Sequence, residues 1–222
     1  DVVVSLAQSD NGSLWVGTYG AGLNRFDLNA AGGYESSDFL LPLADQRVMA
    51  LWAEDDDNLW IGTRTAGLCQ FSVSSGGLSC LVHEEGDQNS LSANGITAIF
   101  GEKDVIWVGT YGGGLNKIDR VTGKFTHYRH DVGDIHSLGS DRVLAIYRDS
   151  FGILWVGAEN GGLNLLDEVS QKFDRFQANE DDPDSVSNNT TWEIFESSDG
   201  TLWIGTLNGG VNIWHIDDRR RG

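Results

Sequence analysis

A ten-residue motif recurs five times in this chain of 222 residues. It reads WVGTYGAGLN from Trp15, WIGTRTAGLC from Trp60, WVGTYGGGLN from Trp107, WVGAENGGLN from Trp155 and WIGTLNGGVN from Trp203. The five tryptophans stand 45, 47, 48 and 48 positions apart. A period of this length is typical of propellers and solenoids, in which similar units pack side by side.

Each unit reads as four short strands separated by turn signals. The third unit shows them as GITAIFGE, VIWVGTY, GLNKIDR and KFTHYRH, with turn segments such as YGGG and RVTGK between them. Adjacent apolar residues such as Ile106 and Trp107 lie on opposite faces of a strand, so the middle strands are expected to be buried on both faces. The units are rich in Gly, Val, Thr and Trp and show no helical stripe. The sequence therefore predicts an all-β chain that folds as four-stranded antiparallel blades of a β-propeller.

The units begin near Val3, Val48, Ile96, Val143 and Thr191, and together they form a single propeller segment over residues 1–222. The expected blades span residues 2–44, 45–92, 93–139, 140–187 and 188–217, and the last of them lacks a fourth strand. An open arc of blades leaves apolar faces and strand edges uncovered, which native proteins avoid. We therefore expect about five blades that belong to a larger propeller, with imperfect closure as five blades as the alternative.

The recurring residues of the motif are expected to be structural. A tryptophan at the same strand position in every blade predicts a flat wedge between neighbouring blades. The structural tryptophans are Trp15, Trp60, Trp107, Trp155 and Trp203. The glycines allow positive φ and a close approach of the next blade. The repeated asparagines Asn24, Asn116, Asn164 and Asn212 are expected to form hydrogen bonds within their blades.

The charge of the chain disfavours two classes of partner. The net charge is −18, from 33 acidic and 15 basic residues. A nucleic acid or an anionic membrane surface requires a basic face, so we expect neither nucleic-acid binding nor direct membrane contact. No run of about 18 apolar residues is present that could span a bilayer.

The whole repeat resembles the two-component regulator propeller repeat. The stretch that carries the resemblance best is VIWVGTYGGGLNKIDRVTGKFTHYRHDVGDIHSLGSDRVLAIYRDSFG, from blade 3 into blade 4. The resemblance covers all five units, although Cys69 replaces the asparagine, Ala158 replaces the threonine, and blade 1 lacks a clear SLS.N segment after its last strand.

The resemblance implies a bacterial, membrane-anchored sensor whose periplasmic propellers form the input module, often for oligosaccharides. Its partners would be a small-molecule or oligosaccharide ligand and the rest of the sensor, which ends in a histidine kinase or a diguanylate cyclase. We expect a periplasmic, non-catalytic region of an inner-membrane-anchored protein, with a homodimer left open. The alternatives are a propeller lyase or glycosidase that uses acidic loop residues, and a protein-interaction scaffold.

Candidate ligand-binding residues follow from the fold. In propellers the usual binding face carries the loops between the second and third strands and the loops that lead into each first strand, where sequence varies on a constant frame. Tyr, Arg, Asn and Asp side chains there suit a polar ligand with a ring, such as a sugar; the alternative is that each is an ordinary solvent-exposed loop residue. The candidates are Tyr19, Arg47, Arg64, Asn94, Tyr111, Asp141, Arg142, Glu159, Asn160, Asn188, Asn189 and Asn208.

Other chemistry is weak in this sequence. The five histidines show no spacing typical of a metal site, and the acidic stretches EDDD and NEDDPD do not match a calcium loop. YGGG lacks the Lys-Ser/Thr of a phosphate-binding loop. We therefore expect no metal, no cofactor and no catalytic residue.

The two cysteines lie on neighbouring strands of blade 2. If the turn VSSG sets the register, Ser72 faces Gly77, and Cys69 then lies opposite Cys80. Directly opposed residues have Cβ atoms about 4.5–5.5 Å apart, close to the reach of a disulfide. The spacing predicts a cross-strand disulfide, with two buried free thiols as the alternative.

Overall fold

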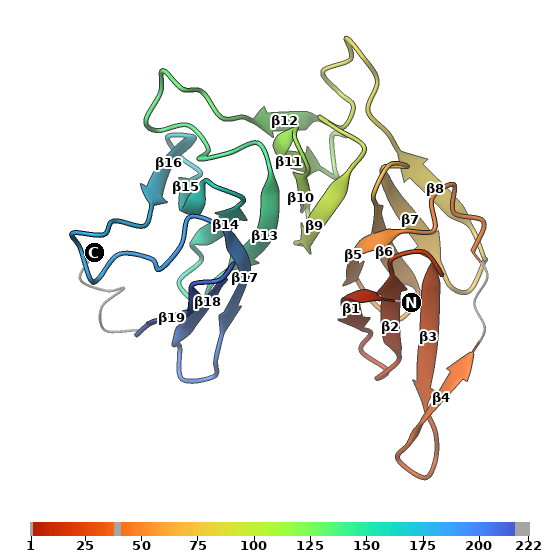
Figure 1. The fold of residues 1–222 in the computed structure, drawn as a ribbon. Helices are drawn as coiled ribbons and strands as arrows, with labels where there is room; N and C mark the ends of the chain where they lie inside the picture. The colour runs from red at the N-terminus through yellow and green to blue at the C-terminus, as the bar shows by residue number, and fades with distance from the viewer. Residues whose placement is uncertain (1, 38–40, 216–222) are drawn as a thin grey trace. The chain divides into compact units, whose positions relative to one another are not determined.

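The computed structural model describes residues 2–37 and 41–215, which form nineteen β-strands in five antiparallel sheets (Figure 1). Within each sheet the strands are neighbours in chain order. No helix in these ranges is long and apolar enough to cross a membrane. The prediction of an all-β chain with propeller blades is confirmed, and we call the sheets blades 1 to 5.

The bounds of the strands follow in chain order. Blade 1 contains β1 (Val3–Gln8), β2 (Leu14–Thr18), β3 (Leu23–Leu28) and β4 (Tyr34–Ser37). Blade 2 contains β5 (Val48–Ala53), β6 (Asn58–Thr63), β7 (Leu68–Ser72) and β8 (Leu78–Leu81). Blade 3 contains β9 (Ile96–Gly101), β10 (Val105–Thr110), β11 (Gly114–Asp119) and β12 (Phe125–Tyr128). Blade 4 contains β13 (Val143–Arg148), β14 (Leu154–Ala158), β15 (Gly162–Asp167) and β16 (Lys172–Phe176). Blade 5 contains β17 (Thr191–Glu196), β18 (Leu202–Thr206) and β19 (Gly210–Trp214).

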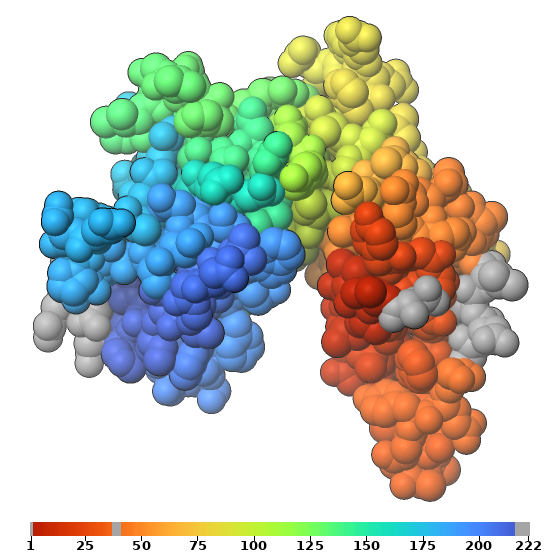
Figure 2. All heavy atoms as spheres, viewed as in Figure 1, coloured from red at the N-terminus to blue at the C-terminus, as the bar shows by residue number. Residues whose placement is uncertain are grey.

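The first strands begin at the residues that the sequence predicts. Blades 1 to 4 have four strands each, and blade 5 has three within the described residues. Residues 216–217, which the sequence analysis included in blade 5, lie outside the described residues. The β3–β4 hairpin extends beyond the rest of its sheet (Figures 1 and 2).

The chain divides into two compact units, which we describe separately. Unit 1 comprises Asp1–Val108 and Lys117–Thr126, and unit 2 comprises Gly109–Asn116 and His127–Gly222. In unit 1, Trp15 packs in one cluster with Ile61 and Phe71 of blade 2. Its ring meets that of Phe71 edge-on, with centroids 6.5 Å apart. Blade 1 therefore packs on blade 2 through the tryptophan of the repeat.

Unit 2 repeats this arrangement between blades 4 and 5. Trp155 packs in a cluster with Ile194, Leu202 and Ile204 of blade 5. The ring centroids of Trp155 and Trp214 are 5.3 Å apart. Trp155 thus packs between the two sheets, as predicted for a tryptophan at this position of the repeat.

Each of the five repeat tryptophans also has a polar anchor. Its indole N–H donates a hydrogen bond to an acceptor five or six residues earlier, at distances of 2.8–3.1 Å. The acceptors are Ser9, Glu54, Glu102, Asp149 and Ser197. Burial differs, however: four of the tryptophans are at most 7% exposed, whereas Trp203 is 39% exposed.

The threonine and glycine of the motif shape the turn between the second and third strands. The Thr63 hydroxyl donates to the carbonyl of Gly67, 3.1 Å away, and accepts from the N–H of Ala66. Gly67 has φ +82°, and a Cβ there would lie 2.1 Å from the carbonyl oxygen of Leu81. Only glycine fits that position without displacing backbone.

The asparagine of the motif is buried and bonded, as predicted, in blade 4. The Asn164 amide donates to the carbonyl of Val156 at 3.1 Å, and its oxygen accepts from the N–H of Gly139 at 2.8 Å. The side chain therefore ties the blade to the loop that precedes it.

In blade 2 the same position holds Cys69. It pairs directly with Cys80 across β7 and β8, and the two form a disulfide with sulfurs 2.01 Å apart. Ser72 donates its N–H to the carbonyl of Gly77 at 2.9 Å, which is the register that the turn sequence predicts. The disulfide therefore closes the outer hairpin of blade 2.

Candidate functional site

The candidate residues lie in two kinds of loop that the backbone brings together. One is the turn after the second strand of a blade, and the other is the segment before a first strand. Tyr19, after β2, forms an isolated antiparallel bridge with Arg47, which precedes β5. Tyr111, after β10, forms the same bridge with Arg142, which precedes β13. At both places, the turn after the second strand of one blade therefore pairs with the segment before the first strand of the next blade. Both pairs consist of a tyrosine and an arginine.

In unit 1, three of the candidates form what we call the Tyr19 cluster: Tyr19, Arg47 and Arg64. The N–H of Arg64 donates to the carbonyl of Arg47 at 3.1 Å. The Arg64 guanidinium lies over the Tyr19 ring, with Cζ 5.8 Å from the ring centroid. Tyr19 as a whole remains 44% exposed. A cation above an aromatic face is attracted by the ring electrons, so the contact orients the exposed arginine.

A carboxylate that the sequence analysis did not select orients Arg47. Asp45 accepts from Nε and Nη2 of Arg47 at 2.8 and 3.0 Å, and from the hydroxyl of Thr65 at 2.6 Å. The hydrogen bond from Arg47 is the main reason that the pKa of Asp45 is held far below its usual range. Its position two residues before Arg47 is the signal that could have found it, because a carboxylate at that spacing can also cap the backbone N–H of Arg47, here 3.0 Å away.

In unit 2, the Tyr111 cluster contains Tyr111, Arg142 and Glu159. The Arg142 guanidinium lies over the Tyr111 ring, with Cζ 4.9 Å from the centroid, and the ring is 47% exposed. Nη1 of Arg142 also forms an ion pair with the Glu159 carboxylate at 2.9 Å. The N–H of Glu159 donates to the carbonyl of Arg142 at 2.8 Å. The two clusters therefore share an aromatic–arginine stack, but among the described residues only the stacked arginine of the Tyr111 cluster is paired with a carboxylate.

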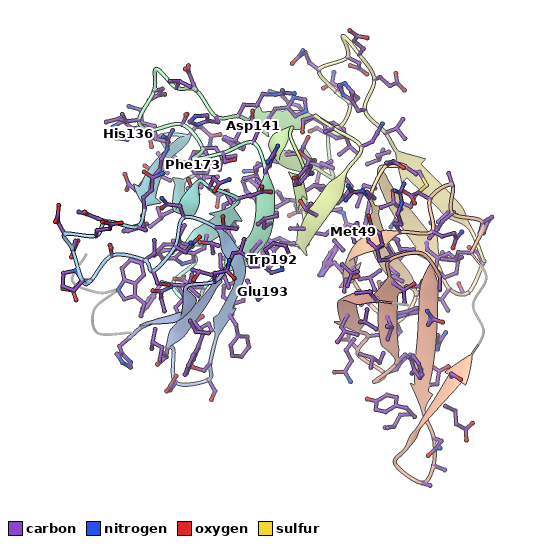
Figure 3. The ribbon with its side chains drawn as sticks, viewed as in Figure 1. Met49, His136, Asp141, Phe173, Trp192 and Glu193 are labelled. Atoms are coloured by element: carbon purple, nitrogen blue, oxygen red, sulfur yellow. A yellow bond between two sulfur atoms is a disulfide. The ribbon has the colours of Figure 1, made fainter. Side chains whose placement is uncertain are left out.

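Several other candidates shape loops. Asn94 accepts the N–H of His83, Asp141 that of His130, and Asn189 that of Ala178, each at 2.7 Å. These bonds close the long loops after the fourth strands of blades 2, 3 and 4. Figure 3 shows Asp141 in the loop before β13. Their side chains are thus already engaged by backbone.

The last three candidates are turn residues. The Asn188 side chain accepts the N–H of Thr190 at 2.8 Å. Asn160 and Asn208 have φ of 57° and 61°, in the left-handed region that asparagine tolerates better than most residues. The geometry gives these positions a conformational role whether or not a ligand contacts them.

Two hydrogen bonds hold the histidine-rich loop after β12. Nδ1 of His130 is bonded to the carbonyl oxygen of Leu138 at 2.8 Å, and the carbonyl of His136 accepts the N–H of Phe173 on β16 (Figure 3). Within residues 2–37 and 41–215, no group of three or more His, Cys, Asp or Glu side chains is placed to hold a metal ion.

Comparisons with known proteins find a match to the repeat and to the fold of the chain. The two component regulator propeller family model matches residues 1–20, 137–160 and 185–208. Each matched segment includes the first two strands of a blade and the turn that follows them. No curated protein sequence matches the chain.

Solved structures resemble the chain in fold. The extracellular domain of BT4673 from B. thetaiotaomicron, described as a hybrid two component system, matches with a TM-score of 0.73 and 22% identity, over 95% of this chain and 27% of that one. The extracellular domain of BT3049 from the same organism matches with a TM-score of 0.51 and 22% identity, over 95% and 39%. PorZ of Porphyromonas gingivalis, a surface component of the type-IX secretion system, matches with a TM-score of 0.67 and 18% identity, over 97% and 33%. The chain thus spans well under half of each of these proteins.

Proposed function

We propose that this chain, in which the two component regulator propeller family model matches residues 1–20, 137–160 and 185–208, is a ligand-sensing propeller region of a bacterial membrane-bound signalling protein. The similar extracellular domains of BT4673 and BT3049 are described as parts of hybrid two component systems. The output domain in this proposal is a histidine kinase or a diguanylate cyclase elsewhere in the same protein. The propeller of the larger protein has more blades than the five seen here.

The observation that carries the proposal is the repeated tyrosine–arginine stack. Tyr19 and Tyr111 are both about half exposed, and each lies beneath an arginine: Arg64 from the turn after β6 covers Tyr19, and Arg142 from the segment before β13 covers Tyr111. An aromatic ring offers a flat apolar face to the C–H groups of a sugar, and a guanidinium offers several fixed donors to its oxygens. An oligosaccharide is therefore the ligand class that these loops fit best.

The disulfide supports an extracytoplasmic location. Cys69 is buried, but its partner Cys80 is exposed on the edge strand β8. Disulfides of this kind persist in the periplasm and outside the cell, whereas cytosolic reductants keep thiols reduced. We place the chain in the periplasm, as part of an inner-membrane-anchored protein.

We propose that this region is not itself an enzyme. A glycosidase needs two carboxyl groups on opposite sides of one glycosidic bond. Of the acidic loop residues, Glu159 is ion-paired with Arg142, and Asp141 accepts the N–H of His130. Both carboxylates hold loops in place, which favours binding over turnover.

Titration calorimetry of the 222-residue chain against an oligosaccharide library, with product analysis of each mixture, tests this function. We expect at least one sugar to bind without being cleaved, and Tyr111→Ala or Tyr19→Ala to weaken that binding about tenfold. Tyr34→Ala is the matched control, because Tyr34 is 48% exposed on β4, away from the candidate loops. Cleavage of the sugar, or an equal loss of affinity in Tyr34→Ala, would contradict the proposal.

A protein-interaction scaffold is the second candidate, and three exposed apolar side chains of blade 5 favour it. Phe195, Trp203 and Ile213 lie opposite one another on three adjacent strands and are 57%, 39% and 49% exposed. Failure of every sugar to bind the folded chain, together with capture of one partner protein that Phe195→Glu abolishes, would favour this reading.

A further inference from the structure

The Tyr19 cluster contains an exposed arginine, Arg64, that has no carboxylate partner among the described residues. Among the residues that the structure describes, the Arg64 guanidinium interacts with the Tyr19 ring and forms no ion pair. The carboxylate at this place, Asp45, is already occupied by Arg47 and Thr65. Arg64 therefore presents a guanidinium that no carboxylate of residues 2–37 and 41–215 neutralises, in a chain where acidic residues outnumber basic ones by 33 to 15.

The Tyr111 cluster provides the contrast within the same fold. There the stacked arginine, Arg142, is paired with Glu159 at 2.9 Å, and Asp141 precedes it in the chain. That cluster carries no excess of positive charge. The sequence difference is localised to one position of the repeat, because the turn residue after the second strand is Arg64 in blade 2 and Glu159 in blade 4.

We propose that the Tyr19 cluster binds the oxyanion of an acidic sugar, either the carboxylate of a uronic acid or a sulfate ester, with Arg64 as the residue that selects it. This inference rests on the proposed sensing function and names the ligand class of one of its two clusters. The planar guanidinium matches two oxygens of a carboxylate or sulfate at once. The exposed part of the Tyr19 ring provides an apolar face for the sugar that carries the anion.

The net charge of the chain does not prevent this binding. At physiological ionic strength, exposed charges more than about 8 Å apart are largely screened from one another. An approaching anion is therefore attracted or repelled by the groups beside it rather than by the distant acidic surface. Beside Arg64 those groups are the Tyr19 ring and the neutralised pair of Arg47 and Asp45.

The test compares acidic sugars with their own neutral forms. The 222-residue chain is titrated with oligomers of galacturonate, of mannuronate and of hyaluronate, with the carboxyl-reduced form of each, and with sulfated oligosaccharides beside their desulfated forms. We expect at least one acidic oligomer to bind about tenfold more tightly than its neutral counterpart. Preference for the uronic acid or for the sulfated sugar identifies which oxyanion the cluster takes.

Two arginine substitutions then locate the effect. Arg64→Gln is expected to abolish the preference for the charged form, measured as the ratio of the affinities for the charged and the neutral form. Arg142→Gln, the matched control, is expected to leave the preference intact. Equal loss in the two variants, or no loss in Arg64→Gln, would overturn the proposal. So would a neutral sugar that binds as tightly as its acidic form, an outcome that leaves the sensing function standing; if no sugar binds at all, both proposals fail.

Discussion

Blades 4 and 5 carry the same ten-residue motif, yet the motif's tryptophan is buried only in blade 4. Trp155 is 1% exposed and lies against Trp214, Ile194 and Ile204 of the next blade. Trp203 has the same indole hydrogen bond, to Ser197, but is 39% exposed. The local geometry is thus encoded within each repeat, whereas burial depends on the blade that follows.

The glycine two positions after the tryptophan shows the same contrast. A Cβ on Gly157 would lie 2.8 Å from the carbonyl oxygen and 2.9 Å from a methyl group of Thr191, on the first strand of blade 5. A Cβ on Gly205 would meet nothing closer than 3.7 Å. The glycine is therefore needed for the approach of the next blade, since neither residue has a positive φ that would require it.

The largest effect is expected from removing the buried wedge. Trp155→Ala should lower the free energy of unfolding by about 3–5 kcal/mol, because it deletes a ring buried between two sheets and leaves a cavity. Trp203→Ala should cost less than about 1 kcal/mol, because much of that ring is already in water. Denaturant titration of the two variants measures both values. Equal losses would show that the motif stabilises its own blade rather than the contact with its neighbour.

A smaller effect is expected from filling the space at the glycine. Gly157→Ala should lower the free energy of unfolding by about 1–3 kcal/mol, because the new methyl group forces Thr191 and its strand away. Gly205→Ala is the control, and we expect a change within about 0.5 kcal/mol. The pair is read from thermal melts at equal protein concentration. A destabilised Gly205→Ala variant would indicate that this face of blade 5 is covered in solution.

Most features of the fold that could be predicted from the sequence are features of the repeat. The period of the tryptophans predicts the blades, and the starts of the first strands at Val48 and Ile96 follow from it directly. The Cys69–Cys80 pairing also follows, since a turn of known length fixes the register of a hairpin. Each of these depends on neighbours close in sequence or on the repeat itself.

The candidate site was only partly visible, because its geometry depends on contacts between blades. The loop positions of Tyr19 and Arg47 could be chosen from the repeat, but their direct bridge could not. The bidentate pair of Asp45 with Arg47 lies in the segment where blade 1 departs from the repeat, so no periodic signal identified it. The loop-closing roles of Asn94 and Asp141 were hidden for another reason: a polar side chain that caps a loop and one that awaits a ligand look alike in sequence.

The smallest expected effect concerns the contact between blades 3 and 4, which can be compared with the contact around Trp155. Tyr128 stands where blade 4 has Phe176, packs edge-on against Phe173 at 5.7 Å and donates its hydroxyl to Gln171. Burial, with a contribution from Glu168, raises the pKa of Tyr128 to about 12 from its usual 10. A raised pKa means that the folded state holds the proton more tightly, so the stabilisation is complete below pH 10 and is lost as the pH rises from 10 towards 12.

The free energy of unfolding should therefore fall between pH 9 and pH 11, and Tyr128→Phe should make that fall smaller by on the order of 1–2 kcal/mol. An unchanged pH dependence in the variant would mean that the hydroxyl reaches water in solution, and that this inter-blade contact is looser than the one around Trp155.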